Sequence, residues 1–185
     1  MITTILFDLD GTLLPMDTRR FAGAYFEALS AKTAGSGYEA GEFINGIVTG
    51  IKVMIDNDGR RTNEEVFWDV LRERCKMERK ELETFFVDFY QNEFACYTTY
   101  ENSCYCKPNI GYYEEVLGKL QVTPEECLMV GNDVDEDMVA EKIGMSVFLV
   151  TDCLLNRSGT DINRYPHGDY NDLRAYIESR ERGSL

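Results

Sequence analysis

The chain has 185 residues, of which 44% are hydrophobic and 28% charged, as in ordinary globular proteins. This length allows one catalytic domain, or a compact core with one inserted module, but not two full-sized enzymatic domains. The formal net charge of −14 disfavours nucleic acid as a partner, because the average surface repels a phosphate backbone. A small anionic substrate remains compatible, since one metal ion and one buried lysine can reverse the local sign.

Neither a membrane segment nor a disulfide framework is expected. No apolar run approaches the roughly 20 residues needed to span a bilayer, and the first residues lack the basic leader of a secretory signal. The six cysteines do not fit a zinc finger, because Cys104 and Cys106 are the only close pair and the single histidine, His167, is distant. We therefore expect a cytoplasmic protein with free thiols.

The first candidate element is an apolar, β-branched run at residues 2–7, which predicts a buried strand. The run stops at Asp8-Leu9-Asp10, and Gly11 then indicates a tight turn. Two carboxylates this close repel each other unless a positive charge lies between them. Hard oxygen ligands suit Mg²⁺, so the pattern predicts a magnesium site, with a solvated acidic turn as the alternative.

Residues 15–92 differ in character, since apolar side chains recur there at helical spacing. Phe21, Tyr25 and Leu29 lie four residues apart, which places them on one helix face. Thr62 opens a Thr-x-x-Glu capping box, which predicts a helix start. The segment is therefore expected to be an all-helical insertion.

Strand and helix patterns alternate after this segment. The apolar runs at 127–130 and 146–150 predict strands that are covered on both faces, and residues 95–100 form a further candidate strand. Helices are expected over 110–120 and 135–143. This alternation predicts an α/β fold with a Rossmann-like parallel sheet as its core.

The predicted domain organisation follows from these elements. Residues 1–14 and 93–185 would form the core, and residues 15–92 the inserted helical cap. In open α/β sheets of this kind, ligands bind at the carboxyl ends of the strands.

A second acidic group, GNDVDED at residues 131–137, follows the strand expected at 127–130. Asp133 and Asp137 are four residues apart, so both carboxylates would lie on one helical face. Acids at a helix N-terminus are also ordinary partners of the helix dipole, but the position at a strand end favours a metal site. The sequence leaves open whether Asn132 or Asp133 is the nearer ligand.

The motif FDLDGTLL, residues 7–14, resembles the first signature of the haloacid dehalogenase superfamily. The resemblance implies that Asp8 attacks phosphorus to give an aspartyl-phosphate, while Asp10 protonates the leaving oxygen and then activates water. It also implies that Gly11 and Thr12 contact the phosphate. An acid at the position of Asp10 is the pattern of the family's phosphatases, as distinct from its dehalogenases.

Two later segments resemble further motifs of this family. Lys107 and Pro108 resemble the third motif, whose lysine neutralises the nucleophile and binds the phosphoryl group as a compact point charge. The GNDVDED segment resembles the acidic fourth motif. The magnesium ligands that the resemblance implies are Asp8, Asp10 through its backbone carbonyl, Asp133 and Asp137.

One family motif is missing from its usual place. The family carries a Ser or Thr at the end of a second core strand, whereas here only a short segment separates Phe94 from Lys107. Thr98 or Thr99 could substitute for it. Each buried, unpaired backbone group costs about 1–3 kcal/mol, so we expect Ala95–Tyr100 to pair beside the first strand or the chain to be poorly soluble.

The function implied by the resemblance is Mg²⁺-dependent hydrolysis of a small phosphate monoester. The expected partner is a small phosphorylated metabolite, with no nucleic acid and no membrane. The alternative is a catalytically impaired, regulatory protein that keeps the metal and phosphate site. Neither the substrate nor the oligomeric state follows from the sequence.

Overall fold

The computed structural model describes residues 2–94 and 103–182. The chain divides into two compact units: a core unit, Met1–Thr18 with Lys107–Leu185, and a helical unit, Arg19–Cys106. The candidate strand Ala95–Tyr100, with Thr98 and Thr99, lies outside the described residues. The predicted domain boundaries stay predictions, because compactness alone does not show that a segment folds independently.

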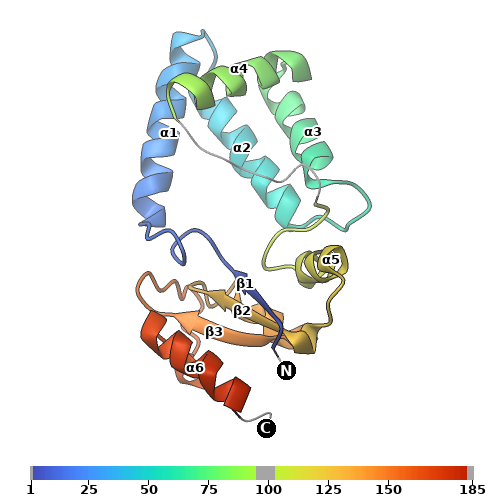
Figure 1. Ribbon diagram of the computed structural model, residues 1–185. Helices are drawn as coiled ribbons and strands as arrows, with labels where there is room; N and C mark the ends of the chain where they lie inside the picture. The colour runs from blue at the N-terminus through green and yellow to red at the C-terminus, as the bar shows by residue number, and fades with distance from the viewer. Residues whose placement is uncertain (1, 95–102, 183–185) are drawn as a thin grey trace. The chain divides into compact units, whose positions relative to one another are not determined.

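The core unit contains a parallel sheet in the order β1-β2-β3-β4, of which Figure 1 labels the first three strands. Its strands are β1 Thr4–Phe7, β2 Cys127–Gly131, β3 Ser146–Val150 and β4 His167–Gly168. The predicted α/β fold and the strands at 127–130 and 146–150 are confirmed. The short strand at His167 is not among the predicted strands, because two residues carry no alternating pattern and this strand is defined only by pairing with β3.

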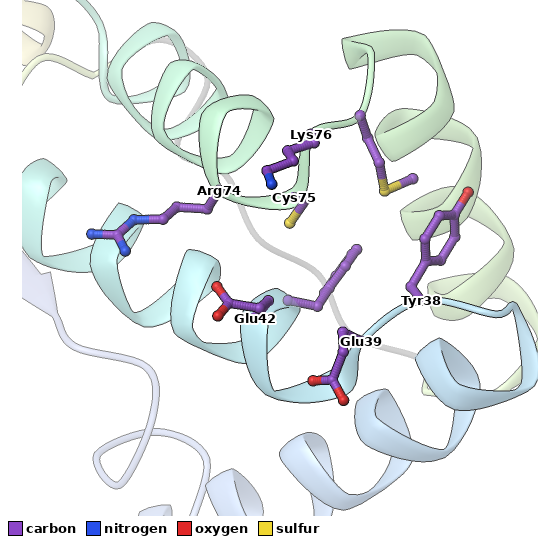
Figure 2. A pocket seen from close by; sticks show the side chains of 8 residues that line it. Tyr38, Glu39, Glu42, Arg74, Cys75 and Lys76 are labelled. Carbon is purple, nitrogen blue, oxygen red and sulfur yellow. The ribbon is translucent and has the colours of Figure 1, made fainter.

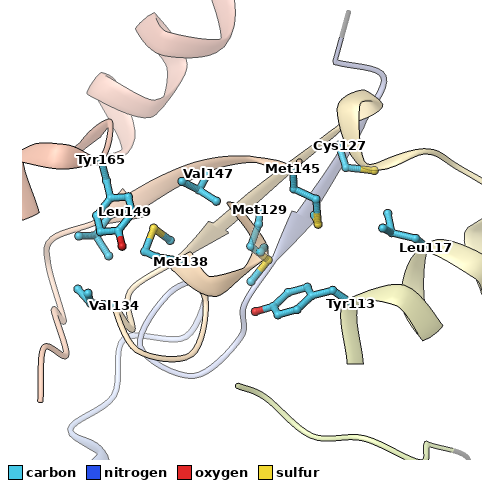
Figure 3. Close-up of a cluster of buried hydrophobic side chains, with 11 residues drawn as sticks. Tyr113, Leu117, Cys127, Met129, Val134, Met138, Met145, Val147, Leu149 and Tyr165 are labelled. Atoms are coloured by element: carbon cyan, nitrogen blue, oxygen red, sulfur yellow. The ribbon is translucent and has the colours of Figure 1, made fainter. Parts of the chain in front are cut away.

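Helices cover both faces of this sheet, as Figure 1 shows for α5 Ile110–Leu120 and α6 Tyr170–Arg182. Successive residues of a strand point to opposite faces, so β2 contributes to two separate apolar clusters. Met129 packs with Tyr113 of α5 (Figure 3), whereas Leu128 packs with Leu173 of α6. This two-sided burial explains why the apolar runs of β2 and β3 are unbroken.

β1 is more exposed than the sequence predicts. Ile5 is 37% exposed and Phe7 is 41% exposed, so the expectation of a buried strand is wrong for these side chains. β1 pairs in register with β2, and no other strand among residues 2–94 and 103–182 pairs with it. Ile5 and Phe7 alternate with the less exposed Thr4 and Leu6, so the exposed side chains share one face of the strand.

The acidic segment does not form the α-helix predicted over 135–143. Residues 134–137 form a turn, and a 3₁₀ helix, η2 Met138–Ile143, follows. It ends at Gly144, whose φ of +95° is the left-handed conformation that glycine adopts readily at helix ends. Two further 3₁₀ turns, η1 Pro124–Glu126 and η3 Ile162–Arg164, flank the strands.

The helical unit contains α1 Thr18–Gly35, α2 Ala40–Ile55, α3 Asn63–Cys75 and α4 Arg79–Asn92. Its apolar cluster includes Leu29, Phe43, Leu71, Leu82 and Phe89. The capping box at Thr62 is confirmed: its hydroxyl accepts from the Glu65 amide at 3.2 Å, and the Glu65 carboxylate accepts from the Thr62 amide at 2.9 Å. Among the described helices, none is both long and apolar enough to cross a membrane.

The described cysteines form no disulfide with one another. They are Cys75, Cys104, Cys106, Cys127 and Cys153.

Candidate active site

The sheet register brings the ends of β1 and β2 to the same edge. Phe7 pairs with Val130, and the Asp8 amide donates to the Val130 carbonyl at 2.8 Å. Asp8 and Asn132 therefore leave the sheet from neighbouring strands, at the edge where parallel α/β sheets bind ligands.

Lys107 bridges two carboxylates at this edge. Its ammonium nitrogen lies 2.7 Å from Asp8 Oδ1 and 2.6 Å from Asp137 Oδ1. Burial alone would lower the pKa of Lys107, but the charges of Asp137 and Asp8 outweigh it, so the pKa is raised. The lysine therefore keeps its positive charge beside the candidate nucleophile.

Asp137 is buried, with 1% of its side chain exposed, and both of its oxygens have partners. Oδ1 accepts from Lys107, and Oδ2 accepts from the Asp133 amide at 3.0 Å. Burial raises its pKa, Lys107 acts in the opposite direction, and the nearby Asp8 charge raises it further. In this arrangement Asp137 orients the lysine, and neither oxygen is free of a protein partner.

Thr12 and Asn132 form a buried polar pair beside Asp8. The Thr12 hydroxyl donates to Asn132 Oδ1 at 3.0 Å and lies 3.4 Å from Asp8 Oδ2. The Asn132 amide in turn donates to the Cys153 carbonyl at 2.7 Å. Gly11 makes this packing possible: its φ is +88°, and a Cβ there would lie 2.4 Å from Asn132 Nδ2.

The two remaining predicted ligands are placed differently. Asp133 Oδ1 accepts from the amides of Asp135 and Glu136, at 2.9 and 3.1 Å, and Oδ2 pairs with Arg157 at 2.7 Å. Its carboxylate thus has other partners than that of Asp137, because the segment turns instead of forming the expected α-helix. The Asp10 side chain is exposed.

Within residues 2–94 and 103–182, no group of three or more His, Cys, Asp or Glu side chains is arranged to hold a metal ion. The metal roles of Asp8, Asp10, Asp133 and Asp137 therefore stay predictions.

Sequence reasoning did not find two partners of the site, Arg157 and Tyr170, and left Asn132 undecided. Arg157 binds Asp133, and the Tyr170 hydroxyl at the start of α6 donates to the Thr12 carbonyl. No local pattern marks either residue, since both reach the site from distant parts of the chain. The position of Asn132, directly after the last residue of β2, was the available indication for that side chain.

A separate pocket of about 370 Å³ lies in the helical unit (Figure 2). It is lined by Tyr38, Glu39, Glu42, Phe43, Arg74, Cys75, Lys76 and Met77. The acids lie at the start of α2 and the basic side chains at the end of α3, where the helix dipoles favour these charges. Their placement is therefore explained without a ligand.

A comparison with known protein families finds a match to part of the chain. Residues 104–166 match the sequence profile of a family described as HAD-hydrolase-like. No curated protein matches the sequence significantly.

Similar solved structures include phosphatases and a dehalogenase. A HAD phosphatase from Thermococcus onnurineus is 17% identical, with a TM-score of 0.49, and the match covers 95% of this chain and 98% of that one. A predicted phosphoglycolate phosphatase from Haemophilus somnus 129pt is 12% identical, with a TM-score of 0.47 and coverage of 95% and 98%. The L-2-haloacid dehalogenase RSc1362 is 15% identical, with a TM-score of 0.48 and coverage of 96% and 99%.

Proposed function

We propose that the chain is a hydrolase of the haloacid dehalogenase superfamily, as the family match at residues 104–166 suggests, and that it hydrolyses a small phosphate monoester. The observation that carries this proposal is the buried arrangement in which Lys107 joins Asp8 to Asp137. A charged lysine beside a carboxylate lowers the cost of bringing an anionic phosphate to that carboxylate. The acid at Asp10 favours phosphate chemistry over dehalogenation, by the family pattern.

In the proposed reaction Asp8 is the nucleophile. Lys107 holds Oδ1 of Asp8, and this oxygen attacks phosphorus, which forms an aspartyl-phosphate and breaks the bond to the leaving oxygen. Asp10 gives its proton to that oxygen and then accepts a proton from the water that cleaves the aspartyl-phosphate. Phosphate is released, and Asp8 and Asp10 return to their starting forms.

Mg²⁺ is the proposed cofactor, because the donors at this edge are hard oxygens. Asp8 Oδ2 and Asn132 Oδ1 both face the Thr12 hydroxyl, so they are the nearest candidates to hold the ion, together with Asp10. When bound, the ion would neutralise charge on the transferring phosphoryl group. Asp137, whose oxygens are bound to Lys107 and the Asp133 amide, is the less suitable ligand.

The proposal is tested with the full chain, Mg²⁺ and a panel of phosphorylated metabolites, by measuring released phosphate. Asp8→Asn removes the charge of the nucleophile with little change in volume, so we expect hydrolysis to vanish while the melting temperature holds. Asp56→Asn is the matched control, since Asp56 is exposed in the helical unit. Undiminished turnover by Asp8→Asn would refute the assignment.

A second candidate is a regulatory protein that binds metal and phosphate without turnover. The sequence favours it, because only a short segment separates Phe94 from Lys107, where the family carries its second-motif strand. It predicts that calorimetry detects Mg²⁺-dependent binding of phosphate or beryllofluoride although no hydrolysis is measured. Hydrolysis that depends on Asp8 would exclude it.

A further inference from the structure

Arg157 lies in the loop after β3 and joins two acids of the GNDVDED segment. Its Nη2 donates to Asp133 Oδ2 at 2.7 Å and to Glu136 Oε1 at 2.8 Å. Asp133 is buried, whereas the Arg157 side chain remains 57% exposed. The guanidinium of Arg157 therefore lies between the acidic segment and the solvent.

The loop that carries Arg157 is tied to the same segment through the backbone. Leu155 donates to the Asn132 carbonyl at 2.9 Å and accepts from the Val134 amide at 2.9 Å. The Arg157 amide donates to Asp135 Oδ2 at 2.9 Å. These bonds hold Arg157 next to its carboxylate partners.

From Asp133, a chain of contacts leads to the candidate nucleophile. The Asp133 side chain accepts from two amides of its own turn, while its backbone amide donates to Asp137. Asp137 holds Lys107, and Lys107 holds Asp8. The conformation of the turn at Asp133 thus determines where the Lys107 ammonium lies.

The turn needs cations, because residues 133–137 contain four acidic side chains. In the described part of the chain, the ion pairs made by these acids are with Arg157 on one side and Lys107 on the other. Without Arg157, Oδ2 of Asp133 would lose its cationic partner, and the carboxylate would keep only the two amide donors of its own turn beside three further acids.

We infer that Arg157 is a positioning residue for the proposed hydrolysis, holding the Asp133 turn so that Asp137 keeps Lys107 on Asp8. The catalytic consequence rests on the proposed function. The effect of Arg157 on the conformation of the Asp133 turn can be measured whether or not the chain hydrolyses a phosphate ester.

The test compares Arg157→Ala and Arg157→Lys with Arg164→Ala. Arg164 is a matched control, because it is also 57% exposed and pairs with an acid of the core unit, Glu141, at 3.1 Å. The measurements are kcat and KM for p-nitrophenyl phosphate with Mg²⁺, the melting temperature, and hydrogen–deuterium exchange of the peptide covering 131–137. For Arg157→Ala we expect kcat to fall at least about tenfold, with KM changed less than about threefold.

Arg157→Lys separates charge from geometry, because lysine keeps the charge but not the planar fork. We expect it to recover part of kcat, whereas Arg164→Ala should leave kcat and exchange unchanged. If Arg157→Ala no longer unfolds cooperatively, Arg157→Lys decides: lower kcat at an unchanged melting temperature supports the inference, and wild-type kcat overturns it.

The exchange measurement separates this inference from the proposed function. If the wild-type chain shows no hydrolysis, the proposed function fails, but exchange at 131–137 can still be compared between variants. Faster exchange in Arg157→Ala than in Arg164→Ala supports the positioning role. Equal exchange in the two variants overturns it.

Discussion

At the scale of single residues, Gly131 shows how closely the site is packed. It is the last residue of β2, and a Cβ there would lie 2.1 Å from Asp137 Oδ2. Asp137 could not keep both the Asp133 amide and Lys107 with a methyl group at that distance. The position of Lys107 therefore depends on the absence of a side chain at Gly131.

Gly131→Ala should displace Asp137 and weaken both stability and activity. We expect a loss of about 1–3 kcal/mol in the free energy of unfolding, as for overpacked sites, and a fall of at least about tenfold in kcat. Urea unfolding and phosphate release measure the two effects. Gly118→Ala in α5 is the control: no atom lies within 4 Å of its Cβ position, so helix propensity should stabilise that variant by up to about 1 kcal/mol. Wild-type activity in Gly131→Ala would contradict the proposed role of Asp137.

At the scale of elements, capping residues predicted helix starts better than acidic runs predicted helices. The Thr62 box forms as its spacing indicates, since both hydrogen bonds lie within four residues of sequence. The acidic run at 133–137 instead bonds to the distant Arg157 and Lys107, and a turn replaces the expected helix. Local patterns determine structure where the partners are also local.

Thr62→Ala tests this at α3. Removing the hydroxyl leaves the Glu65 amide without its cap, so we expect the free energy of unfolding to fall by about 0.5–2 kcal/mol. Thr84→Ala within α4 makes the same chemical change at an exposed helix interior, where alanine has the higher helix propensity, and should not destabilise. An equal loss in both variants, measured by urea unfolding, would show that the capping box contributes nothing.

At the scale of the whole molecule, each apolar cluster lies within one unit. The clusters on the two faces of the sheet draw on the core unit, and the third draws on α1–α4 with Phe94. Each unit is therefore stabilised by its own apolar side chains. We expect a substitution in one cluster to destabilise the unit that contains it and to leave the stability of the other unit unchanged.

Leu82→Ala tests that prediction, because Leu82 is fully buried in α4. We expect a loss of about 2–5 kcal/mol, with faster hydrogen exchange in α1–α4 and unchanged exchange in β2 and β3. Leu120→Ala, at an exposed site in α5, is the matched control and should change little. Equally faster exchange in both units would show that they unfold together.

The sequence by itself predicted the parallel α/β core and the helical segment, because these depend on short local patterns. It also singled out Asp8 and Lys107, which the structure brings to within 2.7 Å of each other. Only the tertiary structure decided that Asn132 faces Thr12 while Asp133 faces Arg157, and that Ile5 and Phe7 remain exposed. These outcomes depend on strand register and on loops far apart in the chain. Neighbouring residues such as Asn132 and Asp133 can point to opposite sides of the backbone. The periodicity of the sequence does not show which distant residue each of them contacts.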